Sequence, residues 1–361
     1  MKESKALIAM SGGVDSSVAA LLTRKAGFTC TGCTLRLYDN EDAGLPREGG
    51  CCSLRDAADA QDVCRRLGMA HYVYDLSREF REQVIGKFVD CYRAGRTPNP
   101  CVDCNRFMKF ELLLERAWLL GCDCLVTGHY ARIVPGPAGG YLLKKALDSG
   151  KDQSYVLHML SQEQLAHLRF PLGELSKEEV RRMAESHGFL NARKPDSQDI
   201  CFVPDGDYAK VIELQTGVPC PPGDFVDRDG NVLGRHQGVI RYTLGQHRGL
   251  GLGWHEPLYV LAINPAENTV TLGPSEALYH RELTVRDFHW IAGEAPGGEL
   301  RCKAKTRYRQ PEQPAAAYPL PEGRVRLIFD APQRAITPGQ YAVLYDGDTV
   351  LGGGEIESVG A

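Results

Sequence analysis

Apolar and polar positions follow two periods in the first two hundred residues, which predicts that strands and helices alternate there. Apolar runs typical of buried strands cover residues 6–10, 28–38, 71–76 and 122–127. Helical spacing or helix start and stop signals mark 18–26, 53–67, 77–95, 106–120 and 176–188. Such alternation is typical of a parallel sheet with helical crossovers. We therefore expect residues 1–207 to form a doubly wound α/β domain that binds ligands at the carboxyl ends of its strands.

The pattern changes beyond about Tyr208. Residues 217–224 read as a hinge, and short alternating segments punctuated by Gly and Pro follow it. Asp229-Gly230 and Asp346-Gly347 are hairpin turn signals, and residues 325–329 and 341–345 are predicted strands. The sequence thus predicts a small mixed or β central domain at 208–282 and a C-terminal β-barrel at 283–361.

Composition is that of an ordinary soluble globular protein. The 361 residues are 43% hydrophobic and 24% charged, and their formal net charge of −4 gives no global attraction to nucleic acid. Any surface for a polyanion must therefore be local. No signal peptide or apolar run of about 18 residues is present, so we expect a cytoplasmic protein without a membrane partner.

Thirteen cysteines, an odd number, argue against a complete disulfide framework. Most stand in apolar patterns, where cysteine behaves as a small hydrophobe: Cys30, Cys33, Cys64, Cys91, Cys122 and Cys124. Cys101, Cys104 and Cys201 instead fall in predicted loops. Taken alone, Cys101-x-x-Cys104 reads as half a zinc site, a redox pair or a coincidence. Zinc is the weaker reading because no second C-x-x-C or H-x₃₋₅-H pair completes a tetrahedron.

The segment Ser11-Gly-Gly-Val-Asp-Ser-Ser17 stands at a predicted strand-to-helix turn. Its two glycines let the backbone approach a ligand, and the helix start presents unpaired N–H groups to an anion. It lacks the lysine of a Walker loop. The motif resembles the signature of the ATP pyrophosphatase (PP-loop) superfamily, whose members cleave ATP between the α and β phosphates. A glycine turn with a capping Ser or Asp is the alternative.

Further motifs stand in the order seen in the bacterial tRNA-specific 2-thiouridylases, which the whole chain resembles. They are Asn99-Pro100 with Cys104-Asn105 and Lys109-Phe110, Thr127-Gly-His-Tyr-Ala131, Lys151-Asp-Gln-Ser-Tyr155, Asp196-Ser with Ile200-Cys-Phe202, Tyr242-Thr-Leu-Gly-Gln246, Lys305-Thr-Arg-Tyr308 and Pro338-Gly-Gln340. The resemblance implies that ATP, with Mg²⁺, adenylates O2 of the wobble uridine of tRNA. Sulfur from a cysteine persulfide then expels AMP.

The same resemblance implies roles for individual residues. Cys201 would receive the persulfide from a sulfur-relay protein, and Cys104 would be the nucleophilic thiol. Either the Cys201 persulfide, or sulfide that Cys104 releases from it, would attack C2, and turnover would leave a disulfide between the two cysteines. ATP would contact Ala9, Met10, Ser11, Gly12, Gly13, Val14, Asp15, Ser16, Leu35 and Gly128. The tRNA would contact Asn99, Pro100, Cys101, His129, Lys151, Asp152, Gln153, Arg307, Tyr308 and Gln340. We expect a monomer.

One position departs from the familiar family pattern. Many members carry Asn-Pro-Asp before the first thiol, whereas this chain has Asn99-Pro100-Cys101. A role for that aspartate as a base or base contact is therefore in doubt here. Cys101, Cys104 and Cys201 could instead ligate three irons of a four-iron four-sulfur cluster, which is a second hypothesis beside the two-thiol mechanism.

Two groups of basic residues could provide the local surface for a polyanion that the net charge of the chain does not. Residues 301–309 alternate cations with other side chains, so in one strand Arg301, Lys303, Lys305, Arg307 and Arg309 would share a face. A second group lies in the central domain: Arg235, His236, Arg241, His247 and Arg248. Two alternatives stay open: an AMP-forming amidating or ligating synthetase, and a non-catalytic RNA-binding sulfur carrier.

Overall fold

A computed structural model describes residues 4–38, 54–137, 139–196, 200–203, 205–253 and 256–360. The N-terminal part is a five-stranded, all-parallel sheet of order β3-β2-β1-β4-β7. These strands are β1 (Lys5–Ala9), β2 (Thr29–Arg36), β3 (Ala70–Asp75), β4 (Cys124–Val126) and β7 (Leu168–Arg169). The chain reverses its strand order between β1 and β4. In such sheets the crevice at this reversal is where ligands bind.

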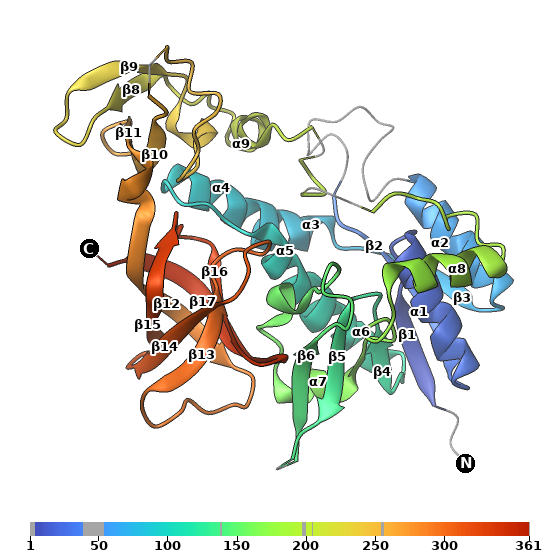
Figure 1. Ribbon diagram of the computed structural model, residues 1–361. Coiled ribbons are helices and arrows are strands. Elements are labelled where there is room, and N and C mark those ends of the chain that lie inside the picture. The colour runs from blue at the N-terminus through green and yellow to red at the C-terminus, as the bar shows by residue number, and fades with distance from the viewer. Residues whose placement is uncertain are drawn as a thin grey trace.

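Helices cover both faces of this sheet (Figure 1). One face packs on α1 (Val14–Lys25), α2 (Leu54–Arg66) and α8 (Lys177–Ser186). The other packs on α7 (Gln162–His167) and on a continuous helical run of α5 (Pro100–Asp103), η3 (Cys104–Leu113) and α6 (Leu114–Leu119), of which η3 is a π-helix. Alternate residues of β1 serve the two sides, since Leu7 joins one core and Ala6 and Ile8 the other.

A second helical run leads from the sheet toward the rest of the molecule. It consists of α3 (Ser77–Phe80), the π-helix η2 (Arg81–Ile85) and α4 (Gly86–Arg93). Its apolar side contributes to the core shared with the central region, which holds α9 (Tyr208–Thr216) and η5 (Val239–Arg241). A four-stranded sheet of order β10-β11-β8-β9 completes that region, from β8 (Gly223–Val226), β9 (Val232–His236), β10 (Tyr259–Asn264) and β11 (Thr269–Gly273).

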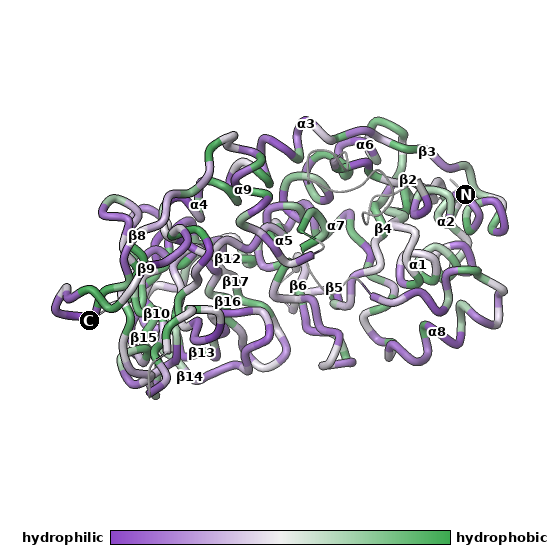
Figure 2. Tube along the Cα trace, turned by 90° about the horizontal axis from the view of Figure 1, so that it is seen from above, coloured by the Kyte–Doolittle hydropathy of each residue, from purple (hydrophilic) through white to green (hydrophobic). Residues whose placement is uncertain are grey.

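The C-terminal part is a closed antiparallel barrel. Its strands follow the order β12-β15-β14-β13-β16-β17, and β17 pairs back onto β12. They are β12 (Tyr279–Trp290), β13 (Leu300–Lys305), β14 (Gln313–Leu320), β15 (Arg324–Arg334), β16 (Tyr341–Asp346) and β17 (Thr349–Val359), preceded by η6 (Ser275–Leu278). Seen from above, barrel and parallel sheet lie at opposite ends of the long molecule, with α5 between them (Figure 2).

The predicted fold class is confirmed: a doubly wound parallel sheet, then a small mixed region, then a β-barrel. The hairpin turns at Asp229-Gly230 and Asp346-Gly347 are also confirmed, because they join β8 to β9 and β16 to β17. Ser53, the first residue of the predicted helix 53–67, lies outside the described residues. No helix within the described residues is long and apolar enough to cross a membrane.

Three features differ from the sequence prediction. Cys101 and Cys104 are helical rather than in a loop, because Pro100 at the first helical position begins a helix six residues before the predicted start. The hairpin of β5 (Ala131–Pro135) and β6 (Tyr141–Lys145) was missed, and β6 pairs with β17 of the barrel. A helix, α9, opens the central region, where no helix was predicted individually, and Gly217 ends it with φ +67°.

Candidate functional site

Residues 11–17, which we call the PP-loop, follow β1 at the reversal point of the sheet. Gly12 has φ +73°, and a Cβ there would lie 2.3 Å from the carbonyl oxygen of Asp56, so only glycine fits between the loop and α2. Gly13 caps α1 without a side-chain hydrogen bond. The loop hydroxyls are organised internally, since Ser16 Oγ accepts from the Ser11 N–H at 3.2 Å and donates to the Gly13 carbonyl at 3.0 Å. The helix start therefore stays open toward an anion.

Gly128, which follows β4, meets this loop at the same edge. A Cβ on Gly128 would lie 2.8 Å from both the Asp15 carbonyl carbon and the Ser16 nitrogen. These are backbone atoms that cannot rotate away, so any larger residue would displace the PP-loop. The two motifs predicted to bind ATP are thus in direct contact, although 111 positions separate Ser17 from Gly128 in the printed chain.

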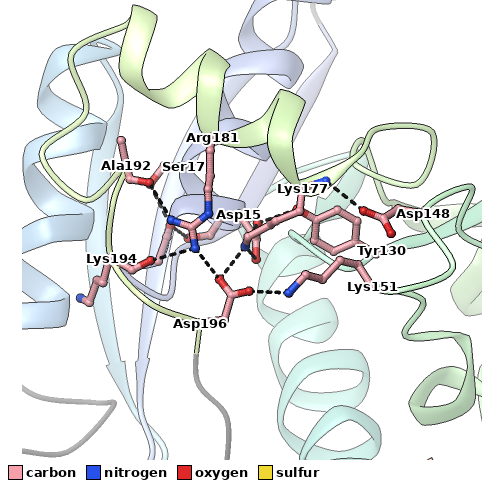
Figure 3. Close-up of polar contacts among 12 residues, drawn as sticks. Asp15, Ser17, Tyr130, Asp148, Lys151, Lys177, Arg181, Ala192, Lys194 and Asp196 are labelled. Carbon is pink, nitrogen blue, oxygen red and sulfur yellow. Dashed lines mark hydrogen bonds and ion pairs between the residues drawn. The ribbon is translucent and has the colours of Figure 1, made fainter. Parts of the chain in front are cut away.

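A network of charges faces this edge (Figure 3). Both carboxylate oxygens of Asp15 accept from Lys177 Nζ at 2.8 Å, and one also accepts from the Tyr130 hydroxyl at 2.8 Å. Lys177 Nζ also lies 2.7 Å from Asp196 Oδ1, while Asp196 Oδ2 accepts from Lys151 at 2.8 Å. Arg181 contacts the same carboxylate at 3.4 Å.

Cations outnumber carboxylates in this network, three to two. Burial alone would raise the pKa of Asp196, but the hydrogen-bonded ammonium groups of Lys151 and Lys177 lower it below its ordinary value. The surplus positive charge stands beside the open helix start of the PP-loop. That arrangement suits an oligophosphate better than a neutral ligand.

Asn191 and Lys194, in the segment that precedes Asp196, form hydrogen bonds with the PP-loop. Asn191 Nδ2 donates to the Gly12 carbonyl and to Ser17 Oγ, each at 2.9 Å, and the residue is only 4% exposed. Lys194 donates to the same Gly12 carbonyl at 3.3 Å and pairs with Asp56 and Asp59 of α2. These contacts fix Asn191 and Lys194 against the PP-loop and α2.

Both predicted catalytic thiols border the same apolar cluster as Leu35, one of the residues expected to contact ATP. Cys104 and Cys201 are each half-buried, and all three side chains pack against one core that includes Met108 and Phe202. The Tyr38 hydroxyl donates to the Cys201 carbonyl at 2.5 Å, which holds that segment near the carboxyl end of β2.

Burial keeps the Cys104 thiol protonated at neutral pH. It raises the pKa of Cys104 to about 11, and Lys109 is the cation that opposes this shift. A thiolate there would need additional positive charge or a donor brought by the bound substrates. The cysteines predicted to be inert behave as expected: burial raises the pKa of Cys30 to about 11 and those of Cys33 and Cys64 to about 12.

The three thiols do not fit a metal cluster as they stand. Among the residues that the structure describes, no three His, Cys, Asp or Glu side chains gather closely enough to hold a metal ion. Cys101 is exposed, whereas Cys104 and Cys201 are half-buried. We therefore derive no step through an iron-sulfur cluster.

The residues predicted to contact tRNA divide by their surroundings. Lys151, Asp152 and Gln153 are engaged inside the protein: Lys151 with Asp196, Asp152 with the Ala146 and Ser154 amides, and Gln153 with the Tyr130 amide. Gln340 donates to the carbonyls of Thr97 and Pro98. Contact of these side chains with tRNA stays a prediction.

His129 and Arg307 are likewise occupied in the structure. His129 is buried between the rings of Phe110 and Phe170, and its Nδ1 lies 2.6 Å from Thr127 Oγ1. Burial, aided by Lys109, holds the pKa of His129 well below its usual range, so the ring is neutral. The Arg307 guanidinium donates to the Leu244 and Ala335 carbonyls. Their roles in binding tRNA also stay predictions.

The expected basic faces are wrong in two respects. Strand β13 ends at Lys305, so Arg307 and Arg309 do not continue its face; Arg301 pairs with Asp330 at 2.6 Å. In the central region His236 is 1% exposed, because its ring bridges the Asn268 carbonyl and the Gly238 amide. Arg235 and Arg241 there are paired with Asp224 and Glu213.

Sequence reasoning missed several site residues. Lys177, Arg181, Asn191 and Lys194 all contact the PP-loop or Asp196, yet they lie in or after an ordinary amphipathic helix. The one available signal was the capping box of Ser176 and Glu179, which fixes where α8 begins and so aims Lys177 at Asp15. Periodicity alone does not distinguish these cations from a solvated helix face.

Three family models match the chain in succession. They are described as the tRNA methyl transferase HUP domain, over residues 4–205, the tRNA methyl transferase PRC-barrel domain, over 213–274, and the aminomethyltransferase beta-barrel domain, over 280–356. A solved structure of a 4-thiouridine synthetase–RNA complex with bound ATP is similar at a TM-score of 0.39 and 18% identity, covering 59% of this chain and 50% of that chain.

Curated relatives match nearly end to end. The tRNA-specific 2-thiouridylase MnmA of Chloroflexus aggregans is 49% identical over 350 residues, which is 97% of each chain. That of Acetivibrio thermocellus is 47% identical over 359 residues, covering 99% of this chain and 100% of the relative. That of Clostridioides difficile is 44% identical over 354 residues, covering 98% of each.

Proposed function

The chain belongs to the tRNA-specific 2-thiouridylase family, and on that basis we propose that it replaces O2 of the wobble uridine of tRNA with sulfur, using ATP. The observation that supports the proposal is that the chain carries both kinds of chemistry that thiolation needs. The PP-loop and Gly128 are in contact at the sheet edge, and Cys104 and Cys201 pack against the same apolar cluster as Leu35 of β2. Phosphate binding alone would not require the thiols.

The division of labour follows from the leaving group. A carbonyl oxygen is expelled with great difficulty, whereas AMP leaves readily. In the proposed reaction O2 of the uridine attacks the α-phosphorus of ATP, and pyrophosphate departs. The outer sulfur of a Cys201 persulfide then forms a bond to C2 and AMP leaves. Cys104 attacks the inner sulfur, which releases the product and leaves a Cys104–Cys201 disulfide for an external reductant.

The charge network supplies the phosphate side of this reaction. Ser11, Gly12, Gly13 and Ser16 would line the triphosphate, and Lys177 and Arg181 stand where its charge would be neutralised. Mg²⁺, if bound, would be carried mainly by phosphate oxygens, since the described residues offer no cluster of carboxylates and Asp15 already pairs with Lys177. It would assist the departure of pyrophosphate.

The remaining assignments complete the proposal. The barrel and the small central region, divided at about residues 207 and 282, would hold the tRNA, and a sulfur-relay protein would charge Cys201. We propose a monomer. Two family models are described by methyl transfer, but a pyrophosphate loop beside two thiols favours thiolation.

The test is mass spectrometry of wobble nucleosides after incubation with ATP, tRNA and a persulfide donor. Wild-type protein should form 2-thiouridine, whereas Cys104→Ala and Cys201→Ala should not. Cys220→Ala is the matched control, because Cys220 borders the same cluster and is also half-buried. Equal activity of all four proteins would refute the two-thiol mechanism. Pyrophosphate release that tRNA does not stimulate would favour a synthetase acting on a small molecule.

A further inference from the structure

A buried group of charges joins the C-terminal barrel to the helical run that carries Cys104. Asp103, the residue before that thiol, is 2% exposed. Its Oδ1 accepts from Lys87 Nζ at 2.7 Å and from the Tyr341 hydroxyl at 3.2 Å. Lys87 donates also to the Tyr341 oxygen at 3.0 Å. The three groups form a closed triangle drawn from α4, α5 and the first residue of β16.

Glu355 of β17 extends this cluster into the barrel. Its carboxylate lies 3.7 Å from Lys87 Nζ and accepts from Arg96 at 3.3 Å and from Arg286 at 2.6 Å. Three cations thus surround the two buried carboxylates. Burial opposes charge on Lys87, but Tyr341 and Asp103 outweigh it and raise the pKa of Lys87 above its ordinary value. Each of the three cations and both carboxylates has an ion-pair partner within the cluster.

A second set of contacts holds the chain on the N-terminal side of Cys101, at Thr97 and Pro98. The Gln340 amide donates to the carbonyls of Thr97 and Pro98, each at 2.9 Å, and the Thr97 amide donates to the Pro338 carbonyl at 3.0 Å. A Cβ on Gly339 would lie 3.0 Å from the Thr97 carbonyl oxygen, so the two backbones are in close contact. Residues 338–341 of the barrel therefore hold the chain both before and after the start of α5.

We propose that Tyr341 is a positioning residue for Cys104, through which the barrel sets where the thiol stands at the sheet edge. This rests on the proposed function. Asp103 and Cys104 are adjacent in an unbroken helical run, so a displacement of one moves the other. A buried carboxylate keeps its partners because losing one leaves a charge unpaired. Movement of the barrel upon tRNA binding would therefore displace Asp103 and, with it, the Cys104 thiol.

The test compares Tyr341→Phe with Tyr345→Phe. Both tyrosines are buried in β16, but the Tyr345 hydroxyl lies 3.4 Å from Ser154 Oγ and is not in the cluster. The full chain without ATP or tRNA is treated with iodoacetamide, and fragment-ion mass spectrometry separates Cys104 from Cys101. We expect Cys104 alkylation to rise about threefold to tenfold in Tyr341→Phe, the ratio that one hydrogen bond represents. It should not change in Tyr345→Phe.

Unchanged Cys104 alkylation in Tyr341→Phe, or an equal rise in both variants, would overturn the proposal. Should Tyr341→Phe fail to fold, Gln340→Met provides a second measurement. It removes the hydrogen bonds to the Thr97 and Pro98 carbonyls and should also raise the alkylation of Cys104. In thiolation assays Tyr341→Phe should lower kcat and leave the KM for ATP unchanged. A wild-type protein that alkylates as described but forms no 2-thiouridine would refute the proposed function alone.

Discussion

The two charge clusters of this molecule are built from the same residue types but differ in how water reaches them. At the sheet edge, the carboxylate side chains of Asp15 and Asp196 are 32% and 23% exposed. At the barrel joint, those of Asp103 and Glu355 are 3% and 6% exposed. Exposed ion pairs exchange partners at little cost, whereas a buried carboxylate that loses its partner is left as an unpaired buried charge. The first cluster therefore suits a site that must admit a phosphate, and the second suits a fixed joint.

The difference also appears in how each cluster meets the backbone. The sheet-edge cations stand next to a helix start whose N–H groups face outward, so an anion gains both. The barrel cluster closes on itself through Tyr341 and Lys87. Similar charges thus serve binding in one place and mechanical connection in the other.

The largest effect should come from the sheet edge. Gly128→Ala places a methyl group 2.8 Å from two backbone atoms of the PP-loop, which must shift. Because a shift of about 1 Å costs on the order of 100-fold in rate, we expect tRNA-stimulated pyrophosphate release to fall by about that factor. Gly253→Ala is the control, since no atom of the described residues lies within 4 Å of the added carbon. Activity within about twofold of wild type in Gly128→Ala would contradict the contact between these loops.

Removing one cation from each cluster tests the comparison directly. Lys87→Met leaves Asp103 buried with Tyr341 alone, and we expect a loss of about 3 kcal/mol in the free energy of unfolding. Lys151→Met should lower the free energy of unfolding by about 1 kcal/mol or less, because water can take the place of the lysine ammonium beside the partly exposed Asp196. Urea denaturation of both variants measures the difference. Equal losses would mean that the two clusters do not differ in the way described.

Acid should weaken the barrel joint through a histidine. Burial lowers the pKa of His158 to about 4, and its ring packs against Tyr341. Between about pH 6.5 and 4 the unfolded chain binds this proton and the folded chain does not, so stability falls as pH falls. For a shift of this size we expect about 3 kcal/mol over that window. His158→Gln should flatten the curve of unfolding free energy against pH; an unaltered slope would assign the acid sensitivity elsewhere.

The smallest effect concerns the exposed cations of the barrel. Lys303 is exposed on β13 and Arg309 lies beyond the end of that strand. Neither forms an ion pair with another of the described residues. Charge reversal of each should reduce the slope of log affinity for tRNA against log salt by about one. Arg301→Glu is the matched control, since its guanidinium already pairs with Asp330. Equal slopes for all three variants would remove this face from the tRNA surface.

Much of the fold could be predicted because its signals are local. The strand before Ser11 and the capping serine of α8 each fix an element without reference to distant residues. The pairing of β6 with β17 could not be predicted, because Lys144 and Thr349 are brought together only by the finished barrel. The helical state of Cys101 was missed although Pro100 signalled it, since the turn-forming residues around it outweighed one proline.

The candidate site shows the same division. Motif residues such as Gly128 and Cys201 could be named from the sequence, but their partners could not. Lys177 and Asn191 act at the PP-loop only because α8 and its following segment fold back over it. Tyr341 likewise meets Asp103 from more than two hundred positions away. Contacts of this range leave no periodic trace in the chain.

The hairpin β5–β6 has a consequence for dividing the protein. It follows β4 in the N-terminal half, yet its second strand adds to the barrel sheet through Lys144 and Thr349, and the Lys145 amide donates to the Asp348 carbonyl at 2.8 Å. A protein shortened to residue 207 would keep this hairpin but lose the strand that shields its edge. Such an uncovered edge invites pairing with another copy. The two halves are therefore best produced and studied as one polypeptide.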